Sequence, residues 1–254
     1  MNNVKKLVFT AMFSTLAVVL GLIQIPTPFA PYLAIDASEI IVLITGNFFG
    51  LGMMSVVIVL RSLLRFALGL ATGFFIVGEL AAIISSLSLG MIFLGAKKII
   101  AKKDDTFKIN NSIMLVFLVL LIPFTYFMFK VENNSWLILG IITLFLPLVA
   151  YLTFTLVKKE QSKKYSKQIF SSSVAILSTS VIMTILNFFV ITPSNALQKP
   201  ALFTTLLTEF NLPMDAYIYG FILPLLPFNI LKGIISVIIF YIIEKTIAKV
   251  INRA

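Results

Sequence analysis

Long apolar segments are the feature that most constrains this chain, because several of them continue for a membrane-spanning length with few charges. About 20 consecutive apolar residues form a helix that crosses the hydrocarbon core of a bilayer. Backbone groups inside lipid must be hydrogen-bonded internally, so only helices and closed barrels span a membrane. The segments lack the alternation of barrel strands. The sequence therefore predicts an all-α, polytopic membrane helical bundle.

Composition supports this class and narrows the chemistry. Of 254 residues, 59% are hydrophobic and 12% are charged, whereas a soluble domain carries about 25% charged residues. Cysteine and histidine are both absent, which excludes disulfides, Cys or His nucleophiles and thiolate or imidazole metal sites. The sequence also contains no Walker A motif. Any chemistry must therefore use carboxylates, Lys, Ser, Thr or Tyr, and we expect no resident cofactor or metal and no nucleotide-driven motor within the chain.

Eight segments are long enough to be considered as spans, and the first is expected to be retained because no signal-peptide cleavage pattern follows it. The third is short and contains Gly69 and Gly73, so we expect it to be tilted or broken. The expected spans are Leu7–Ile25, Ile40–Leu60, Leu64–Val77, Leu80–Ile100, Ile113–Phe129, Trp136–Val157, Ile169–Ile191 and Ile222–Ile243.

The basic residues orient these spans. With a cytosolic N-terminus, most of the 20 Lys and Arg residues fall in cytosolic segments, as the positive-inside rule requires. An even number of spans then places both termini in the cytosol, in a multi-pass protein of the plasma membrane. Arg61 and Arg65 fall between the second and third spans, where we expect cytosolic anchors that a partner subunit could also contact.

The last span, Ile222–Ile243, contains an unexpected polar face. Asn229, Lys232, Gly233 and Ser236 follow one another at helical spacing and therefore share one side of a helix. A lysine within a hydrocarbon-length segment is costly unless it faces protein, water or a ligand. This face is therefore a candidate functional site, although Asn229 could instead cap the helix.

The seventh span carries a second polar stripe, formed by Ser173, Ser180, Thr184 and Asn187. The serines are typical of close helix packing, whereas Asn187 lies near the outer end and offers donors and acceptors. Glu79 begins the fourth span, where it could favour the helix N-terminus or bind a polar ligand.

Two outer connections, Pro26–Ser38 and Thr192–Gly220, could cover the bundle or simply link spans. The first span carries two pairs of small residues at four-residue spacing, Ala11 with Thr15 and Ala17 with Gly21. Such spacing lets another helix approach closely, although it is frequent by chance.

Several stretches, in order along the chain, resemble a known family, the S component of energy-coupling factor (ECF) vitamin transporters, and most closely its riboflavin-binding type. The chain departs from the family pattern in two places. The family often has a lysine just before the loop aspartate, where this chain has Ala34-Ile35-Asp36, and it often has an asparagine at the position of Ala82. The matching stretches are MNNVKKLVFTAMFSTLAVVL, YLAIDASEIIVLITGNFFGLGMMSVVIVLRSLL, TGFFIVGELAAIIS, MTILNFFVITP and ILPLLPFNILKGII.

The resemblance implies a six-helix S-component core, formed by residues 1–108 and 166–254, with an inserted transmembrane hairpin at 109–165. It implies a protein that is not an enzyme and that binds riboflavin near the outer face, with Asn187 and Lys232 holding the flavin. It further implies that Ala11 and Thr15 contact the coupling protein of a module that also contains two ATPases. The complete candidate substrate-binding set is Asp36, Glu79, Asn187, Lys232, Asn229, Tyr32, Phe188 and Thr184.

Aromatic residues near the outer ends of spans could wall a flat flavin ring or serve as ordinary interfacial aromatics. These are Phe29, Tyr32, Phe188, Tyr217 and Phe228. Two alternatives remain open from the residues. One is an S component for folate, pantothenate or a thiamine precursor, and the other is a membrane-embedded enzyme or assembly factor.

Overall fold

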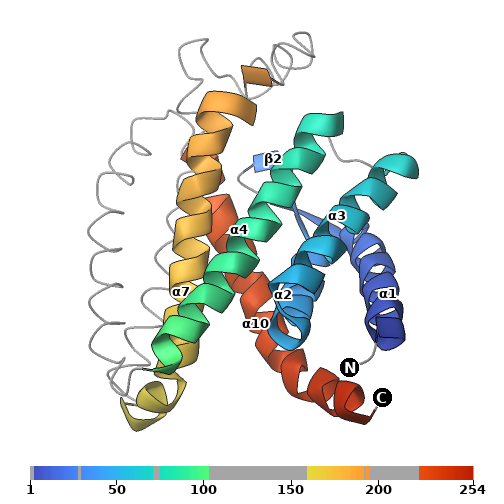
Figure 1. The fold of residues 1–254 in the computed structure, drawn as a ribbon. Coiled ribbons are helices and arrows are strands. Elements are labelled where there is room, and N and C mark those ends of the chain that lie inside the picture. The colour runs from blue at the N-terminus through green and yellow to red at the C-terminus, as the bar shows by residue number, and fades with distance from the viewer. Residues whose placement is uncertain are drawn as a thin grey trace.

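A computed structural model describes residues 3–27, 30–70, 75–102, 159–191, 193–194 and 223–253. Helices dominate this part of the chain, which confirms the all-α prediction (Figure 1). The elements are α1 (Asn3–Gly21), β1 (Gln24–Thr27), β2 (Ala30–Asp36), α2 (Ser38–Phe49), α3 (Leu51–Ala67), α4 (Phe75–Ala101), α7 (Lys159–Leu186), the π-helix η1 (Asn187–Ile191) and α10 (Leu223–Arg253). Most of the predicted hairpin, residues 109–165, lies outside the described residues, so the count of eight spans stays a prediction.

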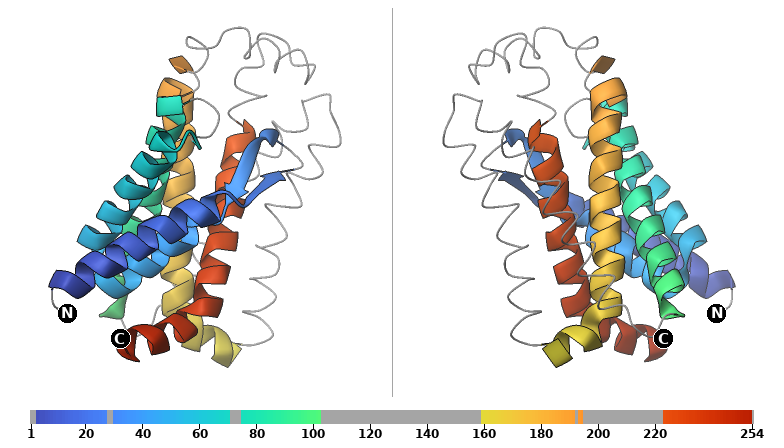
Figure 2. Two further views of the ribbon diagram at one scale, coloured as in Figure 1. Left: turned by 90° about the vertical axis from the view of Figure 1, so that its right-hand side faces the viewer. Right: turned by 90° about the vertical axis from the view of Figure 1, so that its left-hand side faces the viewer.

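The helices form a bundle in which the start of α1 and the end of α10 lie at the same end (Figures 1 and 2). Within the described part, three segments are long and apolar enough to cross a membrane: Val4–Gly21, Ile76–Ala101 and Tyr165–Ile191. The shorter helix α2 is also apolar. These properties are those of an integral membrane protein.

The predicted second and third spans, Ile40–Leu60 and Leu64–Val77, are wrong. A break at Gly50, whose φ of 85° is left-handed, divides the first of these segments into α2 and α3. Helix α3 then folds back along α2, continues to Ala67 and ends before a turn at Gly69, whose φ is also positive. One long apolar segment is thus a pair of shorter helices.

Helix α2 occupies the centre of the bundle, where it contacts α1, α3, α4 and α10. Its apolar residues Ile41, Leu43 and Ile44 are almost completely buried. A helix that is apolar all round is suited to this position. Because α2 is enclosed by other helices, 12 residues suffice for it.

Close packing around α2 depends on small residues. A Cβ added to Gly46 of α2 would lie 2.7 Å from the sulfur of Met54, and one added to Gly90 of α4 would overlap the same sulfur. Met54, which is fully buried, therefore fills the space left by these two glycines. Elsewhere, a Cβ on Gly233 of α10 would lie 3.0 Å from Ile176 of α7.

The first of the two predicted outer connections contains a β-hairpin. β1 and β2 pair in antiparallel fashion, with Gln24 opposite Asp36 and Ile25 opposite Ile35. Strand β2 lies beside the first part of α10 (Figure 2). This hairpin delivers Asp36 to the start of α2 and to the neighbourhood of Lys232.

Candidate functional site

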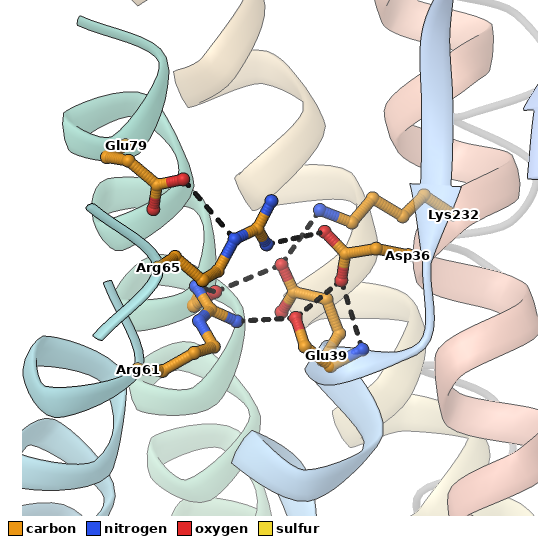
Figure 3. A network of polar contacts seen from close by, with 8 residues as sticks. Asp36, Glu39, Arg61, Arg65, Glu79 and Lys232 are labelled. Carbon is orange, nitrogen blue, oxygen red and sulfur yellow. Dashed lines mark hydrogen bonds and ion pairs between the residues drawn. The ribbon is translucent and has the colours of Figure 1, made fainter. Parts of the chain in front are cut away.

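Six charged side chains converge near the start of α2, at a distance from the bundle end that carries the termini (Figures 1 and 3). They come from five separate elements, namely β2, α2, α3, α4 and α10. We call this group, together with Ser38 and Ser86, the ion network. Its charged members are Asp36, Glu39, Arg61, Arg65, Glu79 and Lys232.

Lys232 forms the shortest ion pair of the network. Its Nζ lies 2.9 Å from Oε1 of Glu39, and the two side chains are 14% and 2% exposed. Ser86 of α4 donates a hydrogen bond of 3.0 Å to the same carboxylate oxygen. A buried ammonium group needs such a partner, because an unpaired charge in a low-dielectric interior is strongly destabilising. The polar face predicted on the last span thus does face protein.

Arg61 connects α3 to α2 and α4. Its Nη1 donates to Ser38 Oγ at 2.7 Å, and its Nη2 donates to Ser86 Oγ at 3.0 Å. Arg61 is fully buried. Two forked hydrogen bonds are the geometry for which a guanidinium is suited. The Ser86 hydroxyl therefore bridges Arg61 and Glu39, since it accepts a hydrogen bond from the first and donates one to the second.

Arg65 bridges the β-hairpin and α4. Its Nη1 lies 3.7 Å from Oδ2 of Asp36, and its Nε lies 3.3 Å from Oε1 of Glu79 (Figure 3). Ser38 donates its backbone N–H to the other oxygen of Asp36 at 3.0 Å and its hydroxyl to that oxygen as well. Burial raises the pKa of Asp36, but Lys232, Arg61, Arg65 and the Ser38 hydrogen bond together hold this pKa below its ordinary value.

The expectation that Arg61 and Arg65 are cytosolic anchors is wrong. Both lie inside the bundle, because the break at Gly50 turns α3 back along α2. Arg61 therefore lies beside Ser38 and Arg65 beside Asp36, away from the bundle end that carries the termini. Their four-residue spacing places both on one helix face, and this was the signal available in the sequence.

The ion network contains three acids and three bases, so its formal charges cancel. Within the described part of the chain, three of its buried atoms have neither a hydrogen-bond partner nor an ion-pair partner: Oε2 of Glu39, Oε2 of Glu79 and Nε of Arg61. Buried polar groups are normally hydrogen-bonded. The network therefore has two hydrogen-bond acceptors and one donor that its own members do not use.

Of the predicted substrate-binding residues, Asp36, Glu79 and Lys232 come together in the ion network. Asn187, Asn229 and Thr184 instead form side-chain hydrogen bonds to the helix backbone. Each donates to the backbone carbonyl four residues earlier in its own helix, at 2.7, 2.7 and 2.8 Å. Asn229 lies inside α10 rather than at its N-terminus, so it does not cap the helix.

The aromatic candidates are less completely placed. Phe188 lies in η1 and packs edge-on against Phe189, with ring centroids 4.8 Å apart. Phe228 is buried in α10. Tyr32 belongs to β2, but its side chain lies outside the described part of the structure, as do Phe29 and Tyr217. A π-helix such as η1 is frequent at functional sites, and Asn187 is its first residue.

The two small-residue pairs of α1 face different surroundings. Ala11 and Thr15 are exposed, among exposed apolar side chains such as Leu7 and Met12. Ala17 and Gly21 are buried against the bundle. Only the first pair is therefore available to another protein, while the second packs within this chain.

The sequence analysis did not identify five members of the ion network as site residues. These are Ser38, Glu39, Arg61, Arg65 and Ser86. Glu39 comes just before the predicted span Ile40–Leu60, so its position in the sequence is that of an ordinary acid at the end of a span. Ionisable residues inside apolar segments usually face a bundle interior and have a function. Applied to the two arginines, that rule would have identified the missing bases.

This fold and its buried charges define a class, that of membrane-embedded proteins with a polar site enclosed by helices. The family model "ECF transporter, substrate-specific component" matches residues 112–244, which is more than half of the chain. The chain therefore belongs to the family of substrate-specific components of ECF transporters. Members of this family are substrate-binding transporter subunits and not enzymes, which removes the enzyme alternative.

A solved structure agrees with this assignment at the level of the fold. It is the S component of a bacterial ECF transporter, which is 19% identical, with a TM-score of 0.51 over 98% of this chain and 99% of that chain. A search of curated proteins finds no match. The predicted resemblance to an S component is thus confirmed, whereas its riboflavin type stays a prediction.

Proposed function

We propose that this S component binds riboflavin at the outer side of the plasma membrane and delivers it inward as part of an ATP-driven ECF transporter. The observation that carries the proposal is the charge-balanced ion network, which contains Lys232, beside the β-hairpin. With a cytosolic N-terminus, the network lies in the outer half of the bundle. A substrate arriving from outside would meet it there.

The balance of charges favours riboflavin over two of the other vitamins considered, folate and pantothenate. Riboflavin has no net charge at neutral pH, whereas folate and pantothenate are anions. A ligand with a net charge would leave that charge uncompensated beside a network whose own charges already cancel, and burying an unpaired charge is costly. The imide and carbonyl groups of a flavin ring and its ribityl hydroxyls supply both donors and acceptors. They match the unused acceptors of Glu39 and Glu79 and the unused donor of Arg61.

The individual roles follow from this arrangement. Lys232 would hold the flavin together with Asn187, whose amide would exchange its bond to the helix backbone for one to the ligand. Asp36 and Glu79 would orient the basic side chains around the polar edge of the ring. Tyr32 and Phe188 would pack on the ring. The remaining candidates, Thr184 and Asn229, would contribute polar contacts from α7 and α10.

The proposed partner contact uses the exposed face of α1. Small residues such as Ala11 and Thr15 let a second helix approach closely within a membrane. The partner would be the transmembrane coupling protein, which in turn binds two ATPases. Transport requires that module, because the S component supplies substrate recognition and the ATPases supply the energy.

Riboflavin binding by the purified protein tests the proposal directly. Quenching of flavin fluorescence on titration into the detergent-solubilised protein is expected to saturate at submicromolar riboflavin. Folate, pantothenate and thiamine serve as matched competitors and should not displace it. A protein that fails to bind riboflavin at micromolar concentrations, or that is stabilised more strongly by another vitamin, would contradict the flavin assignment.

A further inference from the structure

The C-terminal end of α1 lies against the ion network. Gly21, the last residue of α1, is buried. A Cβ built on it would lie 3.1 Å from Nη1 of Arg65 and 3.7 Å from Cβ of Ser38. The second distance is an ordinary van der Waals contact, whereas the first is tight enough that the guanidinium would have to shift by a few tenths of an ångström. A side chain at position 21 would therefore crowd Arg65.

The atom that Gly21 approaches is also one that the network uses. Nη1 of Arg65 is the nitrogen that lies 3.7 Å from Asp36, while Nε of the same guanidinium lies 3.3 Å from Glu79. Because the guanidinium is planar and rigid, a shift of Nη1 also reorients Nε. A methyl group at position 21 would thus disturb both ion pairs at once.

We propose that Gly21 is a positioning residue: it lets the end of α1 pack directly on Arg65 and so fixes the orientation of this guanidinium between Asp36 and Glu79. Insofar as it concerns ligand affinity, the inference rests on the proposed function. It also gives α1 two roles. The helix carries the exposed Ala11 and Thr15 near its middle, and it contacts the site at its end. A displacement of α1 on docking would therefore reach Arg65 directly.

The test compares two glycine substitutions. Gly21→Ala is expected to weaken riboflavin binding by about tenfold, the size of one lost hydrogen bond to a charged group. The matched control is Gly52→Ala in α3, where an added Cβ would meet nothing within 4 Å. This control should leave the affinity unchanged. Equal affinities for wild type and Gly21→Ala would overturn the proposal.

A double-mutant cycle separates positioning of Arg65 from simple packing of α1. Lysine lacks the Nη1 branch, so in an Arg65→Lys background the Gly21→Ala change should cost little further affinity. If Gly21 only packed against the backbone or Ser38, its cost would persist in that background, and the proposal would fail. Should Gly21→Ala alone not fold, the double variant is expected to recover folding. A double variant that still fails while Arg65→Lys folds would also overturn the proposal.

Melting temperatures of the ligand-free variants keep this test independent of the flavin assignment. The same cycle is expected to be non-additive in melting temperature, because the contact exists without a ligand. If wild type binds no riboflavin but the melting cycle is non-additive, the flavin assignment fails and the positioning role stands. If riboflavin binds and both cycles are additive, the positioning role fails alone.

Discussion

Two polar clusters join the same three helices, α2, α4 and α10, at different levels of the bundle. The first is the ion network, where Glu39, Ser86 and Lys232 connect these helices. The second lies nearer the bundle end that carries the termini. There Asn47 donates to Glu244 at 3.0 Å, and Lys97 donates to Asn47 at 2.6 Å. Similar links are therefore repeated along one set of helices.

The clusters differ in burial, and this difference determines what each can contribute. In the second cluster, Lys97 and Glu244 lie 4.0 Å apart and are 45% and 23% exposed, so water can solvate either charge if its partner is removed. In the first, Glu39 and Lys232 are enclosed by protein. Loss of one partner there leaves a charge with no solvent to compensate it. The ion network is thus the more sensitive of the two.

The largest effect is expected from Lys232→Met, which removes the ammonium group and keeps most of the apolar stem. Glu39 would remain as a buried carboxylate without its ion pair. Breaking a buried pair in this way costs about 3–5 kcal/mol of the free energy of unfolding. We expect a large fall in melting temperature and loss of riboflavin binding, measured by thermal denaturation and fluorescence quenching in detergent.

A second substitution identifies the cause of that loss. Adding Glu39→Gln to Lys232→Met removes the stranded charge and should restore part of the melting temperature, without restoring binding. If the double variant is less stable than Lys232→Met by the full cost of Glu39→Gln alone, the two residues are not coupled. The interpretation of the ion network as a paired system would then be wrong.

An intermediate effect is expected between the two clusters, where α2, α3 and α4 pack around Met54. Gly90→Ala would place a methyl group on the sulfur of this residue and should destabilise the protein by about 1–3 kcal/mol through overpacking. Gly95→Ala on the same helix is the matched control, because nothing lies within 4 Å of its added Cβ. Melting temperatures measure both. A Gly90→Ala variant as stable as Gly95→Ala would show that the helices can separate freely at this level.

The long helices could be predicted from the sequence, because the length of an apolar segment is set by the thickness of the bilayer. The predicted span Leu80–Ile100 corresponds to α4, and Ile169–Ile191 falls within α7 and η1. Lys232 could be predicted as a site residue by the same physics, since a lone lysine in such a segment requires a partner.

The pair α2 and α3 could not be predicted, because a helix surrounded by other helices does not need to match the bilayer. Gly50 was one of several glycines in an apolar run, and only the backbone geometry identifies it as the break. That one error placed Arg61 and Arg65 in a connection between spans, whereas both are buried beside Ser38 and Asp36. Two of the three basic members of the ion network were missed because of it.

The smallest effect is expected from Lys97→Met, which alters the second cluster as Lys232→Met alters the first. Exposed ion pairs contribute no more than about 1 kcal/mol, and the hydrogen bond between Asn47 and Glu244 would persist. The melting temperature should therefore change by a few degrees at most. Any loss should diminish as salt is added, because salt screens exposed charges.

Substitutions in the two clusters are expected to differ more in their effect on riboflavin affinity than in their effect on melting temperature. Lys97→Met should bind riboflavin as wild type does, since its cluster lies on the far side of Gly46 and Gly90 from the ion network. A loss of affinity comparable to that of Lys232→Met would mean that both clusters act on the ligand. In that case their difference in burial would not govern function, and the helices α2, α4 and α10 would have to respond to the ligand as one rigid unit.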